Sequence, residues 1–514
     1  MGGNIGGSGN FNIHSMNTIL PYEGMINENY FPIRQRETNL TASLELFKSI
    51  KKNPFNKQLE YFIGLLVKSK YDGIGRQLDE IDLSIALDIS GSMDCYVKKK
   101  PTFKEMYEKE EENNAYHNYD ANYNNEAYHN DGGKNRLQMA KDCLFKLIES
   151  MTDKMKMALT TFDTYSEVVM PLSPKQELKS ISHRINSIIA RGGTDLTAGL
   201  RGAADCLAES TAKFKRVIII TDGWDDNGSF MDLARELNKR DILITILSIC
   251  ESSNSNMYSK FSELKGCNYY FILNEEDMEK YLIKQLNYIC FPVLYDMKVN
   301  FESTDADLIK SIGCGEEIEK KNENEGEAPT PTFYTPKKEI INTATVFPSD
   351  LKQLNGKFYQ EGGLILLKIK PKSLDKNCKI NLKLSYNELE GNHFEMNYII
   401  DFTTNELRNG VNSPEMKKGL AIYYFTKFLR KIKKYMNLNV QFTHGGPVDT
   451  NIKRPEKKYF DFLSRNFENY DKIKIYFNDN YINDINEYQK EYYVKNLDKK
   501  YAECVAKMRE QRNN

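Results

Sequence analysis

Residues 81–92 read IDLSIALDISGS, an apolar run that ends directly in Asp88, Ser90 and Ser92. Residues 216–223 read RVIIITDG, and the apolar residues 217–220 do not alternate in polarity. Such runs are typical of strands buried on both faces, as in a parallel sheet covered by helices. The two stretches therefore predict an α/β sheet with polar side chains at the ends of its strands.

The same pattern extends from residue 76 to residue 290, where apolar runs alternate with amphipathic segments. The predicted strands are Ile81–Leu87, Met155–Phe162, Glu167–Pro171, Arg216–Thr221, Ile242–Cys250 and Tyr269–Leu273. The predicted helices are Arg136–Ser150, Glu177–Ile189, Ala198–Ala208, Phe230–Lys239, Asn256–Lys265 and Glu276–Ile289. This alternation predicts an α/β fold with a doubly wound, mainly parallel, Rossmann-like sheet.

Changes in hydrophobic period divide the rest of the chain. Residues 1–37 are rich in Gly and Asn and predict a flexible N-terminus. The apolar runs within residues 38–75 fit strands or short helices, and as strands they would join a β-domain. Residues 291–412 alternate with period two, which predicts an antiparallel β-sandwich. Residues 413–514 return to helical spacing and predict a helical C-terminal region.

The composition excludes several classes of protein. The 514 residues include 71 Lys+Arg and 72 Asp+Glu, a balance that argues against a nucleic-acid binder. No apolar run approaches the roughly 18–20 residues of a transmembrane span. The nine cysteines form no C-x-x-C pair, and the N-terminal residues carry no signal-peptide pattern. We therefore expect a cytoplasmic protein with reduced thiols.

Polar side chains that follow the predicted strands suggest a metal site. Ligands of open α/β sheets bind beyond the carboxyl ends of strands, so these side chains are expected to converge. They carry only hard oxygen atoms, and the set is Asp88, Ser90, Ser92, Thr194 and Asp222. Oxygen ligands favour Mg²⁺, with Mn²⁺ or Ca²⁺ as substitutes. Two carboxylates and three hydroxyls leave the metal shell incomplete, so an acidic residue of a partner protein could complete it.

The order of these motifs resembles the metal-ion-dependent adhesion site of the von Willebrand factor A (vWA) domain. The resemblance covers residues 81–290 and implies the vWA fold, with Ser90, Ser92 and Thr194 as direct ligands. It implies that the two aspartates contact the metal directly or through water. It further implies a protein-binding function without catalysis. Trp224, Gly193 and Asp195 adjoin the predicted ligands and are candidates for the partner-binding surface, although Trp224 equally fits ordinary packing.

Other interpretations remain open at this point. The protein could be a scaffold subunit of a larger complex in which the metal is structural. A metal-dependent phosphoesterase is the third interpretation, although aspartyl phosphotransferases usually carry Asp-x-Asp and this chain has Ser90 at the second position. The insertion 94–134, which vWA domains usually lack, could select a partner, cover the site or form a solvated loop.

The basic segment 414–436 has two interpretations of its own. It could contact an anionic membrane surface, or it could be a docked helix whose long basic side chains reach solvent. Ala421, Phe425 and Phe428 are part of an apolar stripe at helical spacing, which favours the docked helix.

Overall fold

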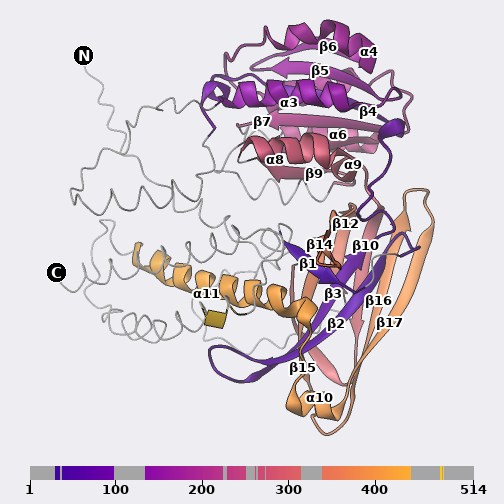
Figure 1. The fold of residues 1–514 in the computed structure, drawn as a ribbon, viewed down its shortest axis with the longest axis vertical. Helices are drawn as coiled ribbons and strands as arrows, with labels where there is room; N and C mark the ends of the chain where they lie inside the picture. The colour runs from indigo at the N-terminus through magenta and orange to yellow at the C-terminus, as the bar shows by residue number, and fades with distance from the viewer. Residues whose placement is uncertain are drawn as a thin grey trace, which may run out of the picture. The chain divides into compact units, whose positions relative to one another are not determined.

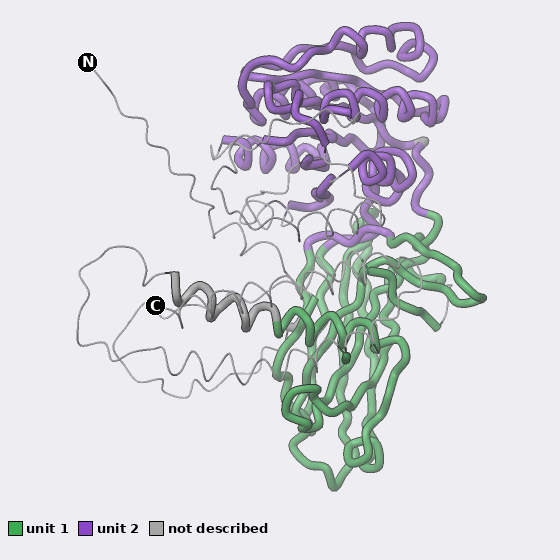
Figure 2. The backbone as a smooth tube through the Cα atoms, turned by 60° about the vertical axis from the view of Figure 1, so that its left-hand side comes forward, with its two compact units in different colours: residues 1–74, 296–343, 349–514 green, residues 75–295, 344–348 purple. Residues whose placement is uncertain are grey.

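The computed structural model describes residues 29–34, 38–97, 134–223, 229–249, 261, 264–272, 274–313, 339–440, 475–476 and 479. The chain divides into two compact units (Figure 2). Unit 1 comprises residues 1–74, 296–343 and 349–514, and unit 2 comprises residues 75–295 and 344–348. Unit 2 is thus inserted into the sequence of unit 1.

Unit 2 contains a six-stranded sheet (Figure 1). Its strands are β4 (Ile81–Asp88), β5 (Lys156–Phe162), β6 (Ser166–Pro174), β7 (Phe214–Thr221), β8 (Ile242–Ser248) and β9 (Asn268–Phe271). Their order across the sheet is β6-β5-β4-β7-β8-β9. All neighbouring strands are parallel except β5 and β6, which form an antiparallel pair. The α/β fold predicted for this part of the chain is therefore confirmed.

Helices of unit 2 pack on the strands through apolar side chains. The main helices are α3 (Arg136–Ser150), α4 (Lys175–Ile181), α5 (Leu196–Asp205) and α6 (Ser229–Lys239). Side chains of α5 and α6, such as Leu200 and Phe230, share one buried cluster with Ile219 of β7 and Ile244 of β8. Every residue of β4 and of β8 is buried, which explains why their sequences do not alternate in polarity.

Several predicted elements of unit 2 differ from the observed ones. The helix expected at Glu276–Ile289 is divided into α8 (Glu275–Glu279), a π-helical turn (Lys280–Lys284) and α9 (Leu286–Ile289). The helix expected at Glu177–Ile189 ends early, as α4 followed by a 3₁₀ turn over Ser182–Ile185. The helix expected at Asn256–Lys265 lies almost entirely outside the described residues. Apolar periodicity does not distinguish these helical variants, because segments of one or two turns are too short to separate their different numbers of residues per turn.

Unit 1 contains antiparallel strand pairs. One four-stranded sheet has the order β11-β15-β3-β2, a second has the order β12-β10-β16-β17, and a three-stranded sheet has the order β1-β14-β13. The strands are β1 (Tyr30–Ile33), β2 (Ser43–Lys52), β3 (Leu59–Lys68), β10 (Leu294–Glu302), β11 (Ala306–Ile312), β12 (Glu339–Val346), β13 (Leu351–Leu354), β14 (Lys357–Glu361), β15 (Leu364–Pro371), β16 (Cys378–Glu388) and β17 (His393–Phe402).

Two segments depart from the predicted domain boundaries. Strand β1 lies within residues 1–37, for which we expected a flexible N-terminus, and it pairs with β14. Residues 344–348 belong to unit 2, although the sequence placed them inside the β-domain. Both differences depend on contacts between segments that are distant in sequence, so local composition could not reveal them.

A long helix, α11 (Lys417–Val440), follows a short helix, α10 (Thr404–Asn409). Its residues Leu420, Tyr424 and Phe428 are buried in one cluster with residues of β2, β3 and β15, such as Phe47 and Leu366. The described side chains in the apolar stripe of segment 414–436 are therefore covered by strands of unit 1. This favours the docked helix over the membrane contact. None of the helices in the described ranges is long and apolar enough to span a bilayer.

Candidate functional site

The candidate site lies where β4 and β7 end side by side. The two strands are parallel neighbours in register, with Leu87 opposite Ile220. The chain passes from β4 to β5 and β6 on one side of the sheet and to β7, β8 and β9 on the other. The point between β4 and β7 is therefore the topological switch point, where open α/β sheets bind their ligands.

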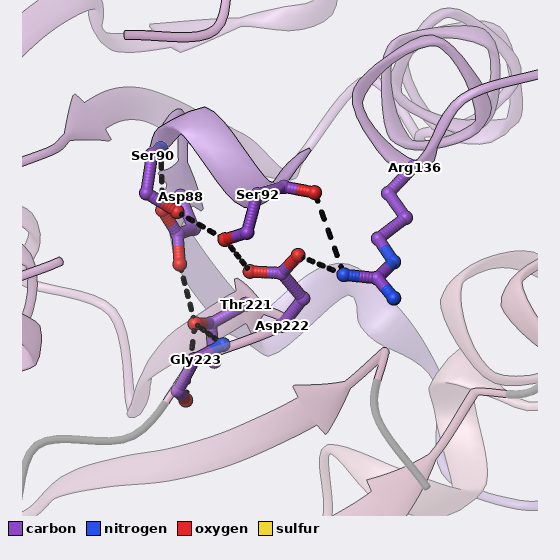
Figure 3. Close-up of polar contacts among 7 residues, drawn as sticks. All are labelled: Asp88, Ser90, Ser92, Arg136, Thr221, Asp222 and Gly223. Carbon is purple, nitrogen blue, oxygen red and sulfur yellow. Dashed lines mark hydrogen bonds and ion pairs between the residues drawn. The ribbon is translucent and has the colours of Figure 1, made fainter. Parts of the chain in front are cut away.

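Asp88, the last residue of β4, is fixed through both carboxylate oxygens (Figure 3). The residue is 0 % exposed. Its Oδ1 accepts a hydrogen bond from the backbone N–H of Ser90 at 2.7 Å, and its Oδ2 accepts one from Thr221 Oγ1 at 2.6 Å. Thr221, at the end of β7, was not among the predicted site residues. The sequence signal for it was present, because Thr221 directly precedes Asp222 in the second strand-end motif.

A row of side-chain oxygens connects the two loops. The hydroxyl oxygens of Ser90 and Ser92 lie 3.1 Å apart, and Ser92 Oγ donates to Asp222 Oδ1 at 2.8 Å (Figure 3). Ser90 is only 2 % exposed, whereas Ser92 is exposed at the rim. The structure thus brings together four of the five predicted ligands, Asp88, Ser90, Ser92 and Asp222.

The fifth predicted ligand, Thr194, lies on a third loop that adjoins the other two. The backbone N–H of Gly91 donates to the carbonyl oxygen of Gly192 at 3.2 Å, which joins the first loop to the third. A Cβ atom at Gly223 would lie 3.1 Å from Thr194 Oγ1, so the third loop also packs against the residue after Asp222. Gly192 has φ +71°, a left-handed conformation that favours glycine at this turn.

Arg136 is a site residue that the sequence analysis missed. It is the first residue of α3, after the N-cap Asn135, whose side chain accepts a hydrogen bond from the N–H of Gln138. Its guanidinium forms an ion pair with Asp222 Oδ2 and donates to the carbonyl oxygen of Ser92 at 3.4 Å (Figure 3). The predicted start of this helix at Arg136 was the available signal. The intervening insertion concealed it, since 44 residues separate Arg136 from Ser92.

The electrostatics of the site combine two buried carboxylates with one guanidinium. Burial raises the pKa of the Asp88 carboxyl above its usual range, and the nearby charge of Asp222 adds to this rise. Hydrogen bonds from Thr221 and Ser90 favour the charged form of Asp88 and therefore oppose this rise in its pKa. The formal charge of Asp88, Asp222 and Arg136 together is −1, which leaves the site suited to a cation.

The donor set fits a hard divalent cation. Its atoms are carboxylate and hydroxyl oxygens, without nitrogen or sulfur, and this favours Mg²⁺, Mn²⁺ or Ca²⁺ over zinc. Within the described ranges, no group of three or more His, Cys, Asp and Glu side chains could hold a metal ion. A metal at this site would therefore depend on the serine and threonine hydroxyls as much as on the carboxylates.

The three residues predicted to contact a partner differ in their structural environment. Gly193 is exposed on the third loop. Asp195 is the N-cap of α5, and its side chain accepts a hydrogen bond from the N–H of Ala198 at 2.9 Å. Trp224 lies outside the described residues, as does most of the insertion 94–134. The role of these residues in partner binding stays a prediction.

Part of this chain is similar to a known family of domains. Residues 124–224 match the von Willebrand factor type A domain family. A 179-residue stretch is 22 % identical to the Escherichia coli (strain K12) protein "Uncharacterized protein YfbK", and it covers 33 % of this chain and 31 % of YfbK. This chain thus matches about a third of the length of that relative.

Solved structures also align with this chain, with low sequence identity and TM-scores below 0.5. A von Willebrand factor type A protein from Catenulispora acidiphila aligns with a TM-score of 0.42 and 11 % identity, over 80 % of this chain and 84 % of that one. The ArnB paralog VWA2 from Sulfolobus acidocaldarius aligns with a TM-score of 0.35 and 11 % identity, over 84 % and 90 %. The PilB minor pilin from Streptococcus sanguinis aligns with a TM-score of 0.31 and 14 % identity, over 48 % and 79 %.

Unit 2 is thus an α/β domain with a cluster of oxygen-bearing side chains at its switch point. The family match supports its assignment as a von Willebrand factor A domain, a class that typically mediates protein–protein interaction or adhesion. The matched residues 124–224 include Thr194 and Asp222 but begin after Asp88, Ser90 and Ser92. The match therefore supports the assignment of the domain, and it does not extend to the first three predicted ligands.

Proposed function

We propose that unit 2 is a metal-dependent protein-binding module. In this proposal Asp88, Ser90, Ser92, Thr194 and Asp222 hold one Mg²⁺, with Mn²⁺ or Ca²⁺ as substitutes. The observation that carries the proposal is the continuous row of oxygens from Ser90 through Ser92 to Asp222 at the switch point of the sheet. The bound ion would supply a positive charge, and an acidic side chain of a partner protein would complete its coordination shell.

The chain's own residues have distinct parts in this proposal. Asp88 is held by Thr221 and by the backbone of Ser90, so its charge stays in one place without a cost in side-chain entropy on binding. The hydroxyls of Ser90 and Ser92 offer neutral ligands, which leave more of the ion's charge available to an outside acid. The exposed position of Ser92 places part of the site at the surface, within reach of a partner.

Paired binding experiments test the proposal. Replacing both Ser90 and Ser92 with Ala should abolish Mg²⁺ binding in a calorimetric titration and abolish partner capture from native extract. The matched control is Ser180→Ala with Ser182→Ala, because in the described part of the chain these hydroxyls on α4 and the following turn donate to backbone carbonyls of α4 alone. EDTA should abolish capture by the wild-type chain and by the control.

The same experiments distinguish the two alternatives. Partner capture that ignores both EDTA and the serine substitutions would contradict the metal bridge and favour a scaffold subunit with a structural or dispensable metal. We further propose that the module is not an enzyme, since Ser90 stands where an aspartyl phosphotransferase would carry its second carboxylate. Magnesium-dependent turnover of a phosphoester that Asp88→Asn abolishes would refute this and establish a phosphoesterase.

We also propose a cytoplasmic location for this binding activity. The described residues include six free cysteines, and most of them are buried, as Cys143 and Cys290 are. Buried thiols without disulfide partners are typical of proteins in reducing compartments. Localisation of the fluorescently tagged full chain in intact cells checks this proposal.

A further inference from the structure

The guanidinium of Arg136 lies against the candidate metal site and contacts one of its carboxylates. It pairs with Oδ2 of Asp222, whose other oxygen accepts from Ser92. The side chain of Asp222 is 0 % exposed, whereas that of Arg136 is 26 % exposed. One partner of this pair is therefore fully enclosed, and the other extends from the helix start toward solvent.

A buried carboxylate without a counter-charge is strongly unfavourable. Asp88 and Asp222 bring two such groups to the same place, and the charge of Asp222 makes the charging of Asp88 less favourable. Arg136 supplies a compensating positive charge from within the chain. Its positive charge therefore offsets part of the negative charge of this site when no metal is bound.

We propose that Arg136 is a tethered cation that competes with the metal ion for Asp222 and makes metal binding depend on an acidic ligand. This inference rests on the proposed metal site. A divalent ion that reaches Asp222 must displace the guanidinium or share the carboxylate with it. Either event removes part of an existing ion pair, so the affinity of the chain for the metal alone is reduced.

The charge balance explains the link to an acidic ligand. With a divalent ion present, Asp88 and Asp222 contribute −2, the ion +2 and Arg136 +1, so the site carries a net charge of +1. A carboxylate from a partner brings this sum to zero. Because binding free energies are linked reciprocally, an acid that neutralises the excess charge also tightens the hold on the metal. Without Arg136 the metal-loaded site would already be neutral.

The local structure allows the Arg136 side chain to move away from Asp222 without unfolding α3. Its backbone is held independently of the ion pair, because its N–H donates to the carbonyl oxygen of Cys95 at 3.0 Å. The N-cap Asn135 fixes the start of the helix. Only the long, partly exposed side chain needs to change rotamer, and this motion is fast compared with binding.

Calorimetric titration of the full chain with Mg²⁺ alone tests the inference. Arg136→Gln should raise the Mg²⁺ affinity on the order of tenfold, within the range of typical coupling energies. Arg136→Lys keeps the positive charge and should stay close to the wild type. The matched control is Arg235→Gln, which removes an equal charge from an exposed pair with Asp232 on α6 and should leave the affinity unchanged. An unchanged or weaker affinity in Arg136→Gln would overturn the inference.

A measurement on the wild-type chain avoids any effect of the substitutions on folding. Phenylglyoxal modifies accessible guanidinium groups, and peptide mass spectrometry locates the modified residues. Addition of Mg²⁺ should increase the modification of Arg136 severalfold and leave Arg235 unchanged. Modification of Arg136 that stays constant while calorimetry shows Mg²⁺ binding would refute the competition but leave the metal site standing. Absence of Mg²⁺ and Mn²⁺ binding in the wild type and in Arg136→Gln would refute the proposed function itself.

Discussion

Thr221 offers the sharpest test of how the site is held together. Its Oγ1 donates to Asp88 Oδ2 at 2.6 Å and accepts from the N–H of Gly223 at 3.1 Å. The substitution Thr221→Val keeps the β-branched shape that suits the end of β7 and replaces only the hydroxyl with a methyl group. It leaves one oxygen of a buried carboxylate without this donor.

The cost of Thr221→Val follows from the charge of the acceptor. A hydrogen bond to a charged group contributes about 1.5–3 kcal/mol, and an unsatisfied buried polar group costs about 1–3 kcal/mol. We therefore expect a loss of about 2–3 kcal/mol in the unfolding free energy of unit 2. For a domain of this size the loss corresponds to roughly 4–12 °C in Tm. Mg²⁺ affinity should fall as well, because Asp88 is no longer fixed.

The assay is urea unfolding of the full chain in EDTA, followed by tryptophan fluorescence. The chain has one Trp, residue 224, within the sequence of unit 2, so the signal reports on that unit. The matched control is Thr160→Val on β5, a buried threonine whose hydroxyl lies 3.6 Å from Cys206 Sγ. The control should lose less than about 1 kcal/mol, as expected for a weak neutral contact. Equal losses in the two variants would refute the assigned role of Thr221.

Three further predictions concern other parts of the chain. Gly223→Ala should weaken Mg²⁺ binding with little change in Tm measured in EDTA, because the added Cβ would lie 3.1 Å from Thr194 Oγ1 and displace it; calorimetry and thermal unfolding check this. Tyr424→Phe should lower the unfolding free energy of unit 1 by about 1.5–3 kcal/mol, since the phenol donates at 2.5 Å to the buried carboxylate of Glu60. Burial raises the pKa of Asp72 to about 6, so unit 1 should lose about 3 kcal/mol of stability as pH rises from about 4 to about 6; urea unfolding across this range measures the loss.

Two of these predictions have specific controls and contrary outcomes. For Tyr424 the control is Tyr61→Phe, whose hydroxyl donates at 3.1 Å to the neutral carbonyl of Leu407 and should contribute less. A larger loss in Tyr61→Phe would contradict the importance of the Glu60 contact. For Asp72 the sign of the pH dependence follows from its raised pKa. The folded chain binds the Asp72 proton more tightly than the unfolded chain does. The protonated side chain therefore stabilises the fold fully below the pKa of Asp72 in the unfolded chain, and this contribution is lost as pH rises. If an Asp72→Asn variant shows the same pH dependence of stability as the wild type, Asp72 is not the source of that dependence.

The sequence by itself determined the class of unit 2 and most of its candidate ligands. The β-branched apolar run at residues 217–220 favours a strand covered on both faces, because an exposed face would leave several apolar side chains in water. The polar residues that follow such strands must lie at one edge of a parallel sheet. This reasoning placed Asp88, Ser90 and Asp222 together, and the structure shows them in one hydrogen-bonded set.

Tertiary structure alone decided which distant residues meet. The pairing of Leu66 in β3 with Leu364 in β15 joins the two ends of unit 1 around the inserted unit 2. The ion pair between Arg136 and Asp222 spans 86 residues, and the Thr221 hydrogen bond to Asp88 spans 133. Local periodicity reports only whether a side chain is buried, since it repeats within a helix or a strand. Which residue pairs with a buried charge depends on how distant segments of the chain pack together, and that is a property of the whole fold.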